Sequence, residues 1–238
     1  MSEPTAIGPA VIPKTTRRAV LALTALSAAV FVAALDQTMV LTVMPSIMRS
    51  LYIDVRHLND AGWIITGYLL GYTVAMPLFG RLADVRGRRP MCVVALLLFM
   101  LGSAFCVVLG RLDLFVAARV VQAAGGGALV PIAMAASADM FPPARRALVL
   151  GIIGGAAEAG GVLGPIYGAG LSALWSWRLI FLVNVPLSLF LIGVTLRLLP
   201  SRQMSASAED SDEDHLQPAG APWWTRGRVD YLGAALMA

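Results

Sequence analysis

The 238-residue chain is 58% apolar and only 13% charged, with a mean hydropathy of +0.76. Soluble domains carry about 25% charged residues, so this composition excludes a water-soluble globular protein. Two cysteines are too few for a secreted disulfide scaffold. What remains is a polytopic membrane protein, and at about 20 residues per span the length allows at most six or seven helices with their loops.

Six apolar runs are long enough to cross a bilayer as helices, and a seventh begins near Val229 and stops at Ala238. The six runs cover residues 20–44, 61–79, 91–109, 113–137, 148–172 and 178–199. Because a run from Val229 to Ala238 gives only about 15 Å of helix, we expect a chain that has been cut. The predicted parts of this all-α membrane protein are a cytoplasmic tail (1–19), a six-helix bundle (20–199), a cytoplasmic linker (200–228) and a truncated seventh helix (229–238).

The positive charges indicate an orientation. Thirteen of the 18 Lys and Arg residues fall in segments that are cytoplasmic if the N-terminus is inside, four fall in outer loops, and Arg119 lies within a span. Since cytoplasmic loops are enriched in these residues, we expect a multi-pass protein of the cell (inner or plasma) membrane with a cytoplasmic N-terminus. The net charge of +4 then reflects topology. It does not indicate a nucleic-acid partner, and the expected surroundings are the lipid bilayer.

Three ionisable residues, Asp36, Arg119 and Glu158, fall within predicted spans. A charge near the bilayer centre costs at least ~2.5–3.5 kcal/mol, so each needs a partner, a water-filled cavity or a proton. Counted along their helices, Asp36 lies about 12 Å and Arg119 about 9 Å from the outer end. Their opposite charges at similar depth suggest either an ion pair that fixes the first helix to the fourth, or a cavity-facing site for a cation or proton.

Glu158 lies about 15 Å into the fifth span, near the midplane. Because desolvation favours a neutral carboxyl group, this residue either exchanges a proton as access alternates or is a hydrogen-bonded packing residue. The spans at 91–109 and 178–199 have no charge in their cores, and the second has only Asn184 as a strong polar group. We therefore expect these two helices to face lipid over much of their surface, while the first, fourth and fifth line an aqueous path.

The segment between the second and third spans has a distinctive sequence, Gly80-Arg-Leu-Ala-Asp-Val-Arg-Gly-Arg-Arg-Pro90. It predicts a short loop with glycines at tight turns and with Asp84 placed to pair with cations. It closely resembles the loop motif of the major facilitator superfamily at the same place, although Val85 stands where the family often has Arg.

Other segments resemble the fourteen-helix drug:proton antiporters of this superfamily, the EmrB/QacA type. Leu41 stands in place of a usual Asn in the first of these segments, Ala123 replaces a Gly in the second, and Ala169 replaces the last Gly of the third. The resembling segments are Leu35–Ile47, Arg119–Gly127, Gly160–Gly168, Trp177–Pro186 and Val229–Gly233. The resemblance implies the N-terminal half of such a transporter, six helices and the start of a seventh.

Three glycines of the fifth span, Gly160, Gly164 and Gly168, are spaced by four and share one helix face, with Pro165 among them. A neighbouring helix can approach closely there, and the proline removes one backbone hydrogen bond. This pattern suits ordinary small-residue packing or a helix that pivots against its neighbour. In the family that the chain resembles, it marks exporters.

The resemblance implies a transporter, not an enzyme, that expels hydrophobic, cationic drugs or other small molecules in exchange for protons by alternating access. Its site residues would be Asp36, Arg119 and Glu158 for proton and substrate coupling. The loop residues Gly80, Asp84, Gly87, Arg88 and Arg89 would close the cytoplasmic side, with the two arginines and Asp84 pairing with the missing C-terminal half. The proton gradient takes the place of a cofactor, and no metal site is expected.

Two alternatives remain at this point. The first is an exporter of a metabolite or lipid within the same superfamily. The second is a transport-incompetent half-bundle, acting as a scaffold or existing only as a fragment. An intramembrane hydrolase has little support, because the spans contain no His-rich cluster and no paired Asp motif.

Overall fold

The computed structural model describes residues 17–52 and 58–200, and these residues form six helices. The helices are α1 (Arg17–Ser50), α2 (Leu58–Arg86), α3 (Arg88–Val108), α4 (Leu112–Met140), α5 (Pro143–Leu174) and α6 (Trp177–Leu198). All six are long and apolar enough to cross a membrane, which confirms the predicted all-helical fold with six spans. Most of the predicted tail, nearly all of the linker and the whole seventh helix lie outside the described residues.

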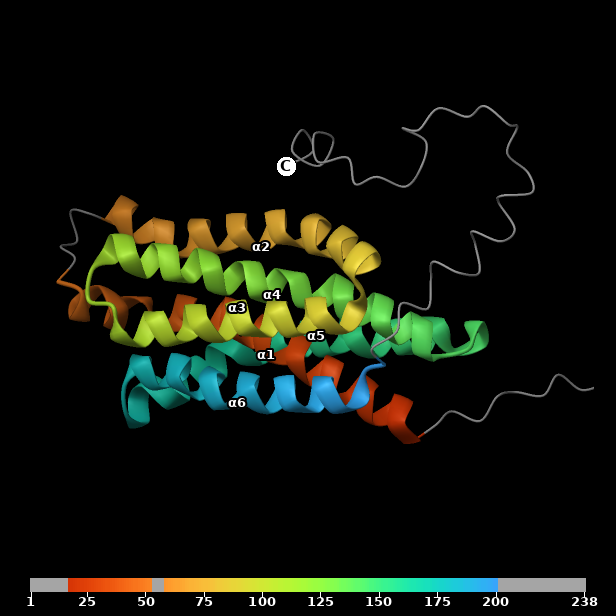
Figure 1. Ribbon diagram of the computed structural model, residues 1–238. Coiled ribbons are helices and arrows are strands. Elements are labelled where there is room, and N and C mark those ends of the chain that lie inside the picture. Colours follow the sequence, from red (N-terminus) through yellow and green to blue (C-terminus); the bar gives the residue numbers. More distant parts are fainter. Residues whose placement is uncertain (1–16, 53–57, 201–238) are drawn as a thin grey trace, which may run out of the picture.

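The helices run alternately in opposite directions, so the start of α1, the α2–α3 and α4–α5 junctions and the end of α6 meet at one end of the bundle (Figure 1). This end carries nine of the 13 arginines in the described part of the chain, and the opposite end carries three. We call it the arginine-rich end. Its arginines are Arg17, Arg18, Arg81, Arg86, Arg88, Arg89, Arg145, Arg146 and Arg197.

The predicted loop at 80–90 is almost entirely helical. The helix α2 continues to Arg86 and α3 begins at Arg88, so a single residue, Gly87, joins them. Gly87 has φ 96°, a left-handed conformation that favours glycine. The expectation of a turn at Gly80 is wrong, because this glycine lies within α2 and faces Pro131 of α4.

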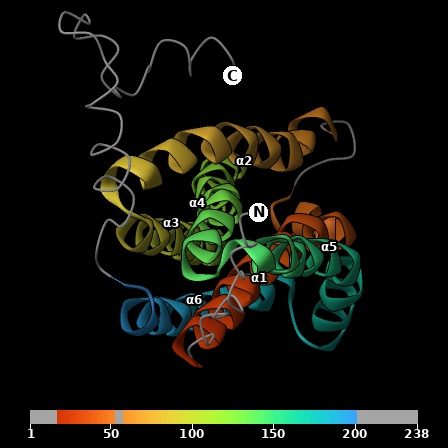
Figure 2. The ribbon, with the colours of Figure 1, turned by 90° about the vertical axis from the view of Figure 1, so that its right-hand side faces the viewer.

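The helix α4 lies in the middle of the bundle, between α2 on one side and α1 and α5 on the other (Figure 2). Three consecutive glycines allow this position, because successive residues of a helix point about 100° apart. A Cβ atom on Gly125 would collide with the backbone of α3, and one on Gly127 with the backbone of α2. A Cβ atom on Gly126 would lie 3.5 Å from Ala33 of α1. Two neighbours, α3 and α2, thus approach the backbone of α4 closely, and α1 makes an ordinary van der Waals contact at Gly126.

The helix α5 is held mainly against α1. As their spacing predicts, Gly160, Gly164 and Gly168 face one neighbour, and each would bring a Cβ atom against the backbone of α1. The Thr38 hydroxyl of α1 donates a hydrogen bond of 2.9 Å to the Gly161 carbonyl in the same contact. The helix continues through Pro165 without a break.

Replacing Gly164 by Val should lower the free energy of unfolding by about 1–3 kcal/mol, the usual cost of overpacking a close contact. The added Cβ atom would lie 2.8 Å from the Leu35 carbonyl oxygen and 3.1 Å from the Met39 nitrogen, both of which are backbone atoms. Thermal unfolding in detergent, followed by circular dichroism, measures the effect. Gly155→Val is the matched control on the same helix, since nothing lies within 4 Å of its Cβ position. Equal losses in the two variants would contradict the proposed close contact.

Candidate functional site

A layer of polar side chains crosses the middle of the bundle. It comprises Asp36 of α1, Ser103 of α3, Arg119 and Gln122 of α4, and Asn184 of α6. All five residues are buried, with at most 4% of their surface exposed. We call this set the polar layer.

Apolar core lies on both sides of the polar layer. On α1, buried residues at positions 22–33 belong to the cluster nearer the arginine-rich end, and those at 39–47 belong to a second cluster toward the other end. On α4 the same two clusters take residues from 128–136 and from 115–118. Asp36 and Arg119 therefore lie between two apolar regions, and water is excluded from above and below.

Arg119 is the donor at the centre of the layer. Its Nη1 atom donates to Oδ2 of Asp36 at 2.6 Å and to Oε1 of Gln122, also at 2.6 Å. The Gln122 amide in turn donates to Oδ1 of Asp36 at 2.9 Å and to the Ser103 hydroxyl at 2.7 Å. The network thereby joins α1, α3 and α4.

Asn184 extends the network to α6. Its Nδ2 atom donates to Oδ1 of Asp36 at 2.8 Å, so the Asp36 carboxylate receives hydrogen bonds from three side chains on two other helices. A buried charge is tolerated when it is paired and its remaining lone pairs are satisfied. Asp36 is paired with Arg119 and accepts three hydrogen bonds, which explains how its carboxylate can lie inside an apolar bundle, while Arg119 Nε has no hydrogen-bond partner among the described residues.

Aromatic rings enclose the Arg119 guanidinium. Its central carbon lies 4.0 Å from the ring centroid of Tyr68, which is 1% exposed, and 5.6 Å from that of Phe181. A guanidinium over an aromatic face is stabilised by the ring quadrupole. Tyr68 belongs to α2, so this contact brings a fifth helix to the polar layer.

The structure places two of the three predicted intramembrane charges together and separates the third. Asp36 and Arg119 form a buried ion pair. Glu158 lies on an exposed face of α5, outside the polar layer, and has no hydrogen bond or ion pair with any described residue. We expected α1, α4 and α5 to line one aqueous path with their charged residues. Asp36 of α1 and Arg119 of α4 do not line such a path, because both are buried away from solvent.

The helices α3 and α6, which we expected to face lipid over much of their surface, also contribute to the polar layer. Both helices supply a buried polar side chain, Ser103 and Asn184, because each is rotated to present that residue to α4 or α1. The signal in the sequence was a polar residue inside a largely apolar run: Ser103 in α3, and Asn184, with Ser188 and Thr195, in α6. Gln122, three residues after Arg119, is likewise a polar residue within an apolar run, and it belongs to the segment Arg119–Gly127 that resembles the family motif.

At the arginine-rich end, the predicted gating residues pair within this bundle. Arg88 forms an ion pair with Asp84 and a second one, at 3.2 Å from its Nε atom, with Asp139 of α4. Arg89 donates from Nη2 to the Leu196 carbonyl of α6 at 2.6 Å. These contacts connect α2, α3, α4 and α6, and Asp84 keeps an exposed side chain.

Six membrane-length helices around a buried ion pair define a polytopic membrane protein. A sequence profile of the Major Facilitator Superfamily matches residues 26–236, and the chain belongs to that superfamily.

The chain is similar to proteins named as triacylglyceride transporters. The one from Mycolicibacterium hassiacum is 42% identical over 193 residues, which are 80% of this chain and 36% of that protein. The one from Mycobacterium tuberculosis is 42% identical over 223 residues, 91% of this chain and 39% of that protein. The chain thus spans less than two fifths of the length of these curated relatives.

Two solved transporter structures share the fold. The human organic anion transporter MFSD10 (TETRAN) has a TM-score of 0.61 at 20% identity, over 76% of this chain and 48% of that one. A bacterial homologue of the human lysosomal transporter Spinster, inward-facing and unoccupied, also has a TM-score of 0.61, at 21% identity over 90% of this chain and 48% of that one. These likenesses establish the fold of the six helices.

Replacing Arg119 by Met should lower the free energy of unfolding by about 3–5 kcal/mol, because the buried Asp36 carboxylate would be left without its counter-charge. The double variant Asp36→Asn with Arg119→Met should lose less than the Arg119→Met variant alone, since no uncompensated charge remains. Unfolding in detergent, followed by circular dichroism, is measured for Arg119→Met, for Asp36→Asn and for the double variant. Arg111→Ala, which breaks an exposed pair with Asp113, is the control and should change little. A double variant as unstable as the sum of the two single variants would show that the pair is not coupled.

Proposed function

We propose that this chain supplies the N-terminal six-helix bundle of a larger transporter that exports an apolar, lipid-like molecule by alternating access. Membership of the superfamily supports the transport mechanism, in which two bundles rock around a site near the membrane midplane. The names of the similar mycobacterial proteins support a triacylglyceride-like cargo. The second bundle would come from the part of such proteins that this chain does not span.

The observation that carries the choice of cargo is the internal neutralisation of the polar layer. Asp36 has its carboxylate oxygens occupied by Arg119, Gln122 and Asn184 and is fully buried. A cationic substrate would have to displace Arg119 and enter between two apolar clusters to reach it. The interpretation as an exporter of cationic drugs therefore loses the residue on which it most depended, and an apolar cargo is favoured.

The polar layer then has a mechanical role in the proposal. Its hydrogen bonds fix α1, α3, α4 and α6 to one another, so that these helices move as one unit during the change of access. In this proposal Arg119 stabilises the ionised form of Asp36 and does not itself carry a proton.

Glu158 takes the role of proton carrier in the proposal. It is exposed on α5, and a carboxylate at membrane depth requires a proton, water or a partner on another bundle. A second bundle packed beside α5 would place Glu158 at the interface where access alternates. This exposed carboxylate is also the one observation that favours the second candidate function, efflux of a cationic drug. The two candidate functions are distinguished by measuring which cargo moves, a lipid or a cation.

At the arginine-rich end, we propose that Asp84 closes the cytoplasmic side by contacting the second bundle. Its side chain is 61% exposed, although it already touches Arg88. Arg88 and Arg89, which are bonded to Asp139 and to the Leu196 carbonyl, would keep the α2–α3 junction in place during closure.

The cargo is tested with the whole transporter, this chain together with its second bundle, reconstituted in liposomes with an imposed pH gradient. Pyrene-labelled triacylglyceride should leave the donor membrane faster than from protein-free liposomes, and ethidium should not move faster. Ethidium efflux without lipid movement would overturn the lipid proposal in favour of the cationic drug. The chain reconstituted alone should move neither, since half of the proposed pathway is absent.

Glu158→Gln should abolish the part of lipid transport that depends on the pH gradient, because the amide cannot take up or release a proton. Glu158→Asp, which keeps a titratable group, should retain part of it. Transport rates with and without the gradient, in the same liposomes, measure the difference. A Glu158→Gln transporter that still responds fully to the gradient would remove Glu158 from proton coupling.

A further inference from the structure

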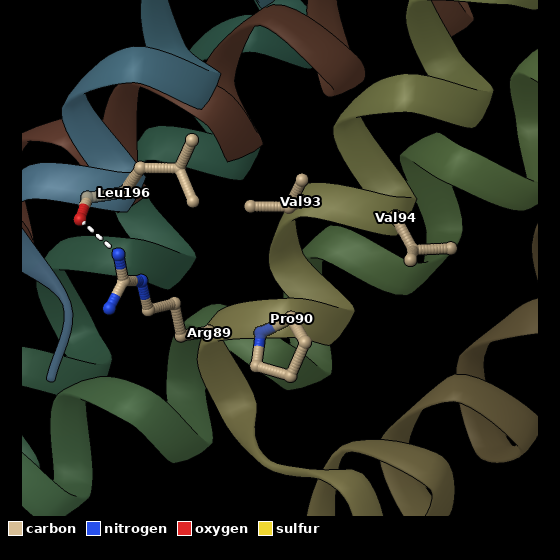
Figure 3. A pocket seen from close by; sticks show the side chains of 5 residues that line it. All are labelled: Arg89, Pro90, Val93, Val94 and Leu196. Carbon is tan, nitrogen blue, oxygen red and sulfur yellow. Dashed lines mark hydrogen bonds between the residues drawn. The ribbon is translucent and has the colours of Figure 1, made fainter. Parts of the chain in front are cut away.

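A shallow apolar groove opens between α3 and α6 at the arginine-rich end (Figure 3). It has a volume of about 500 Å³ and is lined by Arg89, Pro90, Val93, Val94 and Leu196. The first four residues belong to the first two turns of α3, and Leu196 belongs to the last turn of α6. The groove therefore lies where these two membrane-spanning helices reach the membrane surface.

The groove combines an apolar wall with one fixed cation. Val93 and Leu196 face each other across it, and the Arg89 guanidinium lies at the end nearer the helix termini (Figure 3). The hydrogen bond of 2.6 Å from Arg89 Nη2 to the Leu196 carbonyl holds the guanidinium at this position. A guanidinium carries five N–H donors, so this single bond leaves donors for an acceptor in the groove mouth.

The surrounding charge favours an anion. The described residues place two carboxylates at the arginine-rich end, Asp84 and Asp139, and both are paired with Arg88. The last carbonyls of α6, which carry partial negative charge, are bonded to Arg18 at 3.0 and 3.1 Å and to Arg89. The carboxylates and the α6 carbonyls near the groove are thus already paired with arginines. The nine arginines at this end outnumber the two carboxylates.

We propose that this groove binds an anionic phospholipid of the adjacent leaflet. One acyl chain would lie along Val93, Val94 and Leu196, and the headgroup phosphate would accept hydrogen bonds from Arg89. Basic pockets between transmembrane helices on the cytoplasmic side are suited to anionic headgroups, and a guanidinium is well matched to phosphate. A neutral glyceride, the proposed cargo, would leave Arg89 unused, so this site is separate from the transport pathway and does not depend on the proposed function.

The experiment is native mass spectrometry of the purified chain in detergent, with added dioleoyl-phosphatidylglycerol or dioleoyl-phosphatidylcholine. The wild-type protein should retain phosphatidylglycerol in preference to phosphatidylcholine. Arg89→Gln should weaken phosphatidylglycerol retention about fivefold, the effect of one cation near an anionic headgroup. Arg89→Lys should retain most of the binding, which separates the charge requirement from a loss of folding.

Two further variants test the location. Arg86→Gln, which removes an exposed arginine at the same end that does not line the groove, should leave binding unchanged. Val94→Trp, which fills the apolar part of the groove but keeps Arg89, should weaken phosphatidylglycerol binding.

Several outcomes would overturn the proposal. Equal retention of the two lipids would show that the headgroup charge is not recognised. An equal effect of Arg86→Gln and Arg89→Gln would indicate diffuse attraction to the basic surface, and unchanged binding by Val94→Trp would place the lipid elsewhere.

Discussion

The buried ion pair between Asp36 and Arg119 is the interaction on which the rest of this bundle depends. It is held at 2.6 Å between two apolar clusters, where an isolated charge would be very costly. Gln122 and Asn184 donate further hydrogen bonds to Asp36, and Ser103 accepts one from Gln122. These bonds fix the rotation of the helices that carry the three residues. Among the described helices, α5 alone supplies no residue to this set or to its aromatic enclosure, and it is attached to α1 through close glycine contacts. Side-chain hydrogen bonds of the polar layer therefore connect α1, α3, α4 and α6 to one another.

Much of the fold could be predicted from the sequence, because span length and charge depth follow from one-dimensional patterns. Asp36 and Arg119 were predicted to be partners because they have opposite charges at similar depth, and the structure has them in contact. The rotation of each helix about its axis does not follow from hydropathy, which is why the inward positions of Ser103 and Asn184 were missed. The loop expected at 80–90 was also too long, since one glycine at φ 96° is enough to reverse the chain between α2 and α3.

The same chemistry bears on the choice between a cationic and an apolar cargo. Motif resemblance pointed to drug:proton antiporters, whereas the similar proteins are named for triacylglycerides. The residues of such a motif pack and move the helices, and the same motif can therefore occur in transporters of many different cargoes. In this bundle the motif residues Asp36 and Arg119 form an ion pair with each other. Neither side chain therefore offers an unpaired charge that could bind a charged cargo. In the proposed transporter, cargo selection then falls to the surfaces that would face its second bundle.

The polar layer has a consequence for how the chain enters the membrane during synthesis. Asp36 is synthesised and inserted in α1 well before its counter-charge, which arrives 83 residues later in α4. Each of these charges costs at least ~2.5–3.5 kcal/mol alone at the helix centre, and three successive glycines lower the apolar surface of α4 further. The ion pair can therefore form only after α4 has entered the membrane, and until then α1 offsets the cost of Asp36 with its own apolar residues. Asn184, on the last of the six helices, closes the network and makes it complete only when α6 is in place.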